Sequence, residues 1–107
     1  MLGNQNNGNS IQSAEFAEIA DSKNGRINTK GGVPFVNVSS VVPYGVAFAV
    51  PKGENTVVLP VGNTAVYLGV LQKENDLEAG EIMLYSSGGA TVVLKNDGRV
   101  LINGREV

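Results

Sequence analysis

Residues 80–104 read GEIMLYSSGGATVVLKNDGRVLING, and this stretch carries the clearest fold signal in the chain. It contains three runs of β-forming residues, separated by Ser-Ser-Gly-Gly and by Asn-Asp-Gly, which are turn sequences. We therefore predict strands over 81–86, 90–94 and 99–102. The stretch has no Cys, no His and no pair of acids on one helix, so it favours a structural β element over a catalytic one.

The predicted meander has an apolar face. Because side chains alternate along a strand, Val92 and Leu94 share one face, and so do Val100 and Ile102. A sheet this small is marginally stable alone in water, and an unpaired outer edge invites a partner strand. Pairing with copies of itself around a symmetry axis closes such a sheet, so the pattern predicts self-association.

The composition favours a single all-β domain. The 107 residues include 14 Gly and no Trp, Cys or His. The net charge is −2 and the 8 basic residues are scattered, whereas a nucleic-acid-binding protein needs a basic stripe. The absence of Cys excludes a disulfide framework and a thiolate metal site. There is no apolar run of membrane-span length and no signal sequence, so we expect no nucleic-acid partner, no membrane span and no export signal.

Upstream of the meander we predict an N-terminal arm and two hairpins. The polar, Asn- and Gly-rich residues 1–13 are expected to form a flexible arm, or one that orders on a neighbouring subunit. Residues 14–20 and 26–30 read as a hairpin whose turn contains Asn24-Gly25. Residues 55–61 and 64–71 read as a second hairpin around Gly62-Asn63. Both faces of this second hairpin are apolar, which indicates cover on both sides, by a barrel core or by another subunit.

The segment between the hairpins is β-like and rich in turns. Residues 33–42 are β-branched but interrupted by a proline, and residues 46–50 read as a further short strand. Turns are expected at Pro43-Tyr44-Gly45 and at residues 51–54. The charged residues 72–79 read as a solvated loop. These elements place a small β-barrel over residues 14–80 and the β meander over 81–107.

Three groups of residues were weighed as binding sites. The acids Glu74, Asp76, Glu78 and Glu81 lack the fixed spacing of a divalent-ion site, and Asn96-Asp97-Gly98 is a turn more readily than a calcium loop. The tyrosines would stack on bases or sugars only if one barrel face presented them, and most of the aromatic residues are expected in the core. The tyrosines concerned are Tyr44, Tyr67 and Tyr85. From all three groups together we predict no catalytic residue, no metal and no cofactor.

The stretch from Pro43 to Gly104 resembles the baseplate-assembly and central-spike family of contractile-tailed phages of the phage Mu type. The resemblance lies in the order and spacing of turns and strands, and Gly80-Glu81-x-x-Leu84-Tyr85-Ser86 is its strongest motif. Asp97-Gly98 before a last β run matches as well. The remaining landmarks are Pro43-Tyr44-Gly45, the Pro51-x-Gly53-Glu54 turn, the Val57–Leu59 strand, Gly69-Val70 and Leu77.

The resemblance implies a fold and a structural function. Members have a small barrel resembling the oligonucleotide/oligosaccharide-binding (OB) fold, followed by a C-terminal stretch that intertwines with two other copies. The product is a homotrimeric, threefold β-helix or prism that serves as the central spike of the baseplate. The barrel docks to the baseplate hub or tail tube, in a virion tail assembled in the bacterial host cytoplasm. The resemblance assigns Val92, Leu94, Val100 and Ile102 to the trimer axis.

This chain departs from longer members of the family. Those spikes end in an apex where His side chains hold iron, and this sequence has no His. The absence of His therefore predicts one of three things: a short spike, a spike that carries a separate tip protein, or a structural tail piece. The alternative function is a monomeric OB-like barrel that binds single-stranded nucleic acid or oligosaccharide, and a small hydrolase domain is the least favoured reading because no catalytic group is evident.

Overall fold

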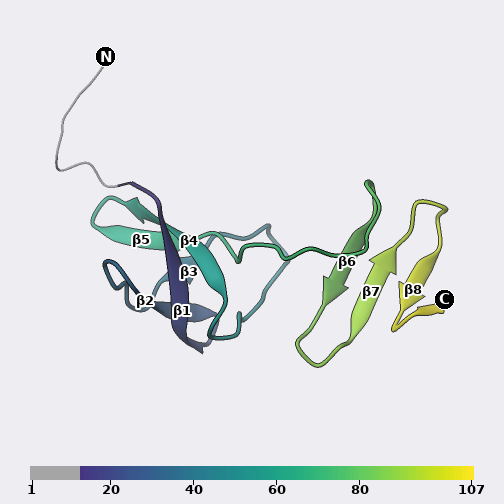
Figure 1. Ribbon diagram of the computed structural model, residues 1–107, viewed down its shortest axis with the longest axis horizontal. Helices are drawn as coiled ribbons and strands as arrows, with labels where there is room; N and C mark the ends of the chain where they lie inside the picture. Colours follow the sequence, from purple (N-terminus) through teal and green to yellow (C-terminus); the bar gives the residue numbers. More distant parts are fainter. Residues whose placement is uncertain (1–12) are drawn as a thin grey trace, which may run out of the picture. The chain divides into compact units, whose positions relative to one another are not determined.

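The computed structural model describes residues 13–107, and every regular element in this part of the chain is a β-strand (Figure 1). This confirms the all-β class. The predicted polar arm, apart from Ser13, lies outside the described residues. One compact unit ends at Gln72, and a second runs from Lys73 to Val107. The strands are β1 (Glu15–Lys23), β2 (Arg26–Lys30), β3 (Ser39–Ser40), β4 (Asn55–Val61), β5 (Thr64–Tyr67), β6 (Ile82–Tyr85), β7 (Thr91–Leu94), β8 (Val100–Ile102) and β9 (Arg105–Glu106).

The first unit is built on a five-stranded sheet in the order β2-β1-β4-β5-β3. Its first hairpin turns at Asn24 and Gly25, whose φ angles of 55° and 80° are those that an Asn-Gly turn supplies at low cost. The second hairpin joins β4 to β5 through Gly62-Asn63. Both hairpins were predicted from the sequence and are confirmed, although β5 ends at Tyr67 and not at residue 71 as predicted. A register shift between Ile19 and Asp21 bends β1, which allows it to pair with both β2 and β4.

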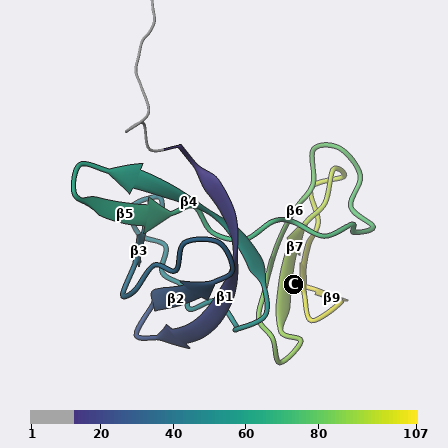
Figure 2. The same cartoon turned by 60° about the vertical axis from the view of Figure 1, so that its left-hand side comes forward.

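The two ends of this sheet approach each other at one point. Val38, next to β3, forms an antiparallel bridge with Ile27 on β2. The Ile27 amide donates to the Val38 carbonyl at 3.1 Å, and the Val38 amide donates to the Ile27 carbonyl at 2.8 Å. Figure 2 shows the curvature of β1 and β4 that brings these ends together. A single bridge is not a continuous ladder, so the sheet is strongly curved but is not a closed barrel.

The core of the first unit lies inside this curved sheet. Ile19, Ile27, Val58 and Tyr67 are almost fully buried. The Tyr67 hydroxyl donates to the Gly25 carbonyl at 2.8 Å, which satisfies a polar group that burial would otherwise penalise.

The predicted strand over 46–50 is absent, which corrects the sequence interpretation. Val50 is buried, and Phe48 packs edge-on against Tyr67 with ring centroids 6.5 Å apart. Of this apolar run only Val50 is buried, and the irregular segment brings it to the core without a strand ladder. Of residues 33–42, only Ser39 and Ser40 form a strand.

The second unit is a four-stranded antiparallel sheet in the order β6-β7-β8-β9. The three predicted strands are confirmed within one or two residues at each end. β9 was not predicted. It follows a turn at Asn103 and Gly104, whose φ angles are 52° and 82°. The Asn103 side-chain oxygen also accepts a hydrogen bond from the Thr91 amide at 2.9 Å, which fixes the open end of the β7–β8 hairpin.

Candidate assembly surface on the C-terminal sheet

One face of the second unit is lined by aliphatic side chains from three strands. The cross-strand partners are Ile82 with Leu94, Leu84 with Val92, Val92 with Ile102, and Leu94 with Val100. Since partners directly opposite each other point to the same side of a sheet, all of these side chains share one face. We call this set the apolar face; its members are Ile82, Leu84, Val92, Leu94, Val100 and Ile102.

The apolar face is open to solvent in the single chain. The exposed fractions are 55% for Ile82, 67% for Leu84 and 44% for Ile102. None of residues 73–107, all of which the structure describes, is buried. A sheet in which no apolar residue is buried has no core of its own. Each exposed Leu or Ile would contribute about 1.5–3 kcal/mol if it were fully buried, which is a strong driving force for association.

The opposite face is less apolar. Val93 faces Met83 on one side and Leu101 on the other, and all three are half-buried. Thr91, its partner Tyr85 and Glu106 lie on the same side, and the Tyr85 ring is 68% exposed. The exposed aliphatic area is therefore concentrated on the apolar face, which is the side that requires cover.

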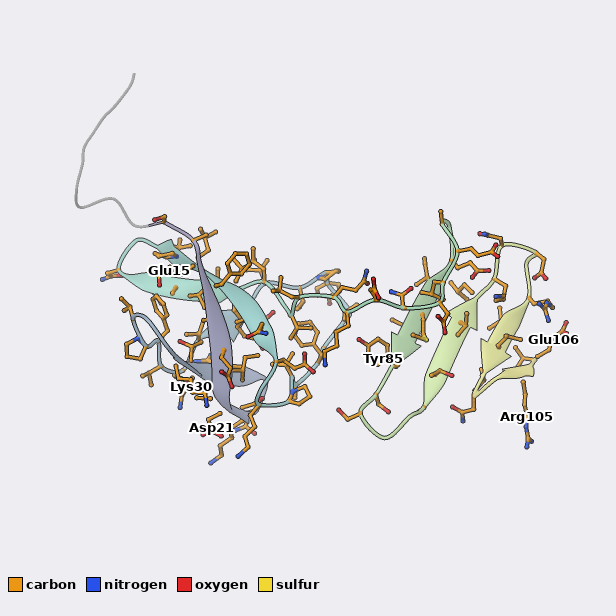
Figure 3. The ribbon with its side chains drawn as sticks, viewed as in Figure 1. Glu15, Asp21, Lys30, Tyr85, Arg105 and Glu106 are labelled. Carbon is orange, nitrogen blue, oxygen red and sulfur yellow. The ribbon has the colours of Figure 1, made fainter. Side chains whose placement is uncertain are left out.

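The two edges of the sheet differ in charge. β9 carries Arg105 and Glu106, which extend from the strand in different directions (Figure 3). β6 reads Ile-Met-Leu-Tyr and has no charged side chain. Charges protect an edge strand against pairing with another chain, so β6 is the edge that is open to strand addition.

The structure places the four residues that the resemblance assigns to a trimer axis on this single face. Ile82 and Leu84 belong to the same face and were missed at the sequence level. The period-two spacing of Ile82 and Leu84 indicates that they share a face of their own strand. It does not specify how this strand pairs with the next one, and therefore not which residues of the next strand share that face. Register comes from the turns, and the Ser-Ser-Gly-Gly turn sets Leu84 opposite Val92.

The loop before β6 is fastened to the turn after β7 by Glu81. One carboxylate oxygen accepts from the Glu78 amide at 3.2 Å, and the other accepts from the Asn96 amide at 3.2 Å. Lys95 Nζ lies 3.2 Å from the carboxylate. The amide hydrogen bonds from Glu78 and Asn96, followed by Lys95, lower the pKa of Glu81. The Glu81 side chain is therefore a structural group and is only 4% exposed.

Gly80 lies against the same turn. Its φ is 100°, and a Cβ atom at this position would lie 2.6 Å from the side-chain oxygen of Asn96. Asn96 donates from its side-chain nitrogen to the Ala79 carbonyl at 3.0 Å, so the Asn96 side chain is held in place. The landmark pair Gly80 and Glu81 thus fastens the first hairpin of the C-terminal sheet.

Two further landmark segments also form turns. Asp97 accepts hydrogen bonds from the Arg99 amide at 3.0 Å and from Arg99 Nε at 2.8 Å, and these bonds lower the pKa of Asp97. Gly98 completes this turn with a φ of 90°. Pro43-Tyr44-Gly45 is closed by a hydrogen bond of 3.1 Å from the Val46 amide to the Pro43 carbonyl.

The aromatic residues do not form a common stacking surface. Tyr67 is buried, whereas Tyr44 and Tyr85 are exposed in different units. The expectation that most aromatic side chains lie in the core is wrong, because Phe16 is also 76% exposed. Of the exposed rings, Phe16 and Tyr85 lie on strands whose faces have no cover in the single chain, whereas Tyr44 lies in a turn.

No group of three or more acidic, His or Cys side chains suited to a metal ion occurs among residues 13–107. The same described residues include no helix that is long and apolar enough to cross a membrane. No protein-family model matches the chain, and no curated protein matches it.

Proposed function

We propose that this chain is a structural component of a phage or phage-derived tail baseplate, where three copies form a short central spike. The C-terminal sheet is the assembly element. Its apolar face turns toward the threefold axis, and its uncharged β6 edge pairs with a neighbouring copy. The function is mechanical, because strand pairing between subunits and buried aliphatic layers make a stiff object. No catalytic step, metal or cofactor is part of this proposal.

The observation that carries the proposal is the absence of any buried apolar residue in residues 73–107. The sheet nevertheless has four strands in continuous register and well-defined turns. A sequence that specifies a regular sheet without a core is one whose core forms on assembly. Copies of the same chain supply that core by symmetry.

The finer parts of the proposal rest on the resemblance to the Mu-type spike family. On that basis the curved sheet of the first unit is the counterpart of an OB-like barrel, and the second unit is the counterpart of the intertwined β-helix. The first unit docks to the baseplate hub or the tail tube. The chain is either a complete short spike, a spike that carries a separate tip protein at its far end, or a structural tail piece, and the location is the virion tail.

Tail particles produced by the cells that encode this chain test the proposal. We expect an antibody against a tag fused to Val107 to label one end of purified tails in electron micrographs. Deletion of the gene should yield particles without an assembled baseplate. Intact tails without the gene, or a chain found only outside the particles, would contradict the assignment.

A second candidate is favoured by one observation, the full exposure of Tyr44 at the tip of a turn. A monomeric OB-like barrel that binds single strands or oligosaccharide would use such a ring for stacking. The net charge of −2 opposes binding to nucleic acid. A gel-shift series at low salt distinguishes the two functions, because tight binding by a monomer would support the second candidate.

A further inference from the structure

The first unit carries an exposed apolar patch of its own on the outer side of its sheet. Phe16 on β1 lies opposite Val57 on β4, and Leu59 lies opposite Val66 on β5. The amide of Leu68 donates to the Val57 carbonyl at 3.1 Å, which continues the first row across a third strand. We call this set the outer patch; its members are Phe16, Val57, Leu59, Val66 and Leu68.

The outer patch faces away from the core of the first unit. Thr56 and Val58, the neighbours of Val57 along β4, are fully buried, so the alternation along the strand directs Val57 outward. Phe16 is 76% exposed and Leu68 is 51% exposed. None of the five members is charged. Glu18, the next outward residue of β1, is paired with Lys30 at 3.4 Å and borders the patch.

The connection between the two units indicates what covers the patch. The segment from Leu68 to Glu81 joins β5 to β6 and, fully extended, spans at most about 50 Å. If the C-terminal sheets form a trimer, two such segments in series join any two first units, which keeps them within about 100 Å of each other. Tethering of this kind raises the effective concentration to about the millimolar range, where an uncharged apolar patch of moderate size associates.

We propose that the outer patch packs against the first unit of a neighbouring copy. The inference rests on the proposed trimer and adds a second contact between its subunits. The outer patch carries no charge, which suits contact with a second copy of the same chain. Identical uncharged patches can meet around a symmetry axis without like-charge repulsion. The first units then form a ring whose contacts depend on the assembly of the C-terminal sheet.

The absence of Cys from the native sequence makes the contact measurable. Single-cysteine variants of the full chain, Phe16→Cys and Val36→Cys, are matched reporters, because the native side chains are 76% and 75% exposed in the single chain. Val36 lies in the loop before β3, outside the outer patch. Leu68→Cys provides a second reporter within the patch. The rate of maleimide labelling is measured for each variant and normalised to the rate in denaturant, and the solution mass is measured in parallel.

We expect both patch cysteines to react at least about tenfold more slowly than the Val36→Cys control in a protein of trimeric mass. Equal rates in a trimer would overturn the patch contact and leave the trimer itself intact. A monomeric mass for all variants and for the unmodified chain would overturn both the proposed function and this inference.

A second comparison excludes cover within one chain. Adding Ile102→Asp to each reporter breaks the proposed trimer, and the patch cysteines should then react as fast as the control. Slow labelling of the patch in a monomer would overturn the contact between copies. If the Ile102→Asp chain does not fold, Leu84→Asp, which places a charge on the same apolar face at a side chain that is 67% exposed, gives the same comparison.

Discussion

Val92 on β7 and Ile102 on β8 are direct cross-strand partners on the apolar face of the C-terminal sheet. Ile102 is 44% exposed, with Val92 on one side and Arg105 of β9 as its cross-strand partner on the other. The pair therefore lies at the surface where a second layer would pack. In a threefold assembly, each of these side chains occurs three times near the axis, so one substitution changes three sites.

Ile102→Asp is predicted to abolish the trimer. Three carboxylates and the three Arg105 guanidinium groups opposite them would be buried together near the axis, and the cost of removing such pairs from water can exceed their attraction. Light scattering after size-exclusion chromatography should give the mass of one chain. Ser87→Asp adds the same charge to the exposed turn between β6 and β7 and serves as the control, with the mass of three chains. A trimer that withstands Ile102→Asp would show that the apolar face is not at the axis.

Gly80→Ala is predicted to destabilise the C-terminal sheet. The new Cβ would meet the Asn96 side-chain oxygen, and rotation of that side chain would break its hydrogen bond to the Ala79 carbonyl. The φ of 100° adds backbone strain, and together these effects should cost about 2–4 kcal/mol. Urea unfolding at a fixed protein concentration measures the loss.

The control for this variant is Gly98→Ala in the same unit. Gly98 has a similar φ of 90°, but a methyl group at this position would have no atom within 4 Å beyond its immediate chain neighbours. Gly98→Ala therefore reports backbone strain alone. Its loss of unfolding free energy should be about 1 kcal/mol smaller than that of Gly80→Ala, because one hydrogen bond contributes about that much. Equal losses would mean that the contact between Gly80 and Asn96 contributes nothing.

Tyr67→Phe is predicted to destabilise the first unit by about 1–3 kcal/mol, because it leaves the Gly25 carbonyl without the buried hydroxyl donor. Tyr44→Phe removes the same atom from a fully exposed ring and should change the free energy of unfolding by less than about 0.5 kcal/mol. The two variants are compared by thermal and urea unfolding. Equal stability of the two variants would show that the hydrogen bond from the Tyr67 hydroxyl to the Gly25 carbonyl does not stabilise this fold.

Acid is predicted to weaken the C-terminal sheet through Glu81. The hydrogen bonds from the Glu78 and Asn96 amides lower its pKa in the folded chain, so the folded state binds its proton less readily than the unfolded state. The resulting stability is present above the ordinary Glu pKa of about 4.3 and is lost as the pH falls through the lower folded value. Unfolding midpoints measured from pH 7 down to pH 3 should therefore decline more steeply in the native chain than in Glu81→Gln. Parallel declines would contradict a structural role of the Glu81 charge.

The sequence was informative where turn chemistry fixed strand ends. Asn24-Gly25 and the Gly62-Asn63 pair located both hairpins of the first unit, because few residues adopt positive φ at low cost. The same logic applied to Asn103-Gly104 would have located β9. It was overlooked because a strand of two residues carries almost no alternating pattern.

Other features depend on contacts that local sequence does not encode. The pattern over residues 46–50 resembled a strand, but the burial of Val50 comes from an irregular path over the core. The role of Glu81 depends on Asn96, which is remote in sequence and is brought close only by the β6–β7 pairing. The full apolar face required the register between strands. Alternation alone relates residues within one strand and leaves the pairing of Leu84 with Val92 undetermined.

The solution mass of the unmodified full chain tests the central claim most directly. Light scattering after size-exclusion chromatography should give three times 11.2 kDa, and the mass should persist on dilution because aliphatic layers from three sheets bury one another. A single-chain mass at all concentrations, with the C-terminal sheet folded, would contradict the account. It would show that residues 73–107 hold their strands together without the core that a trimer provides.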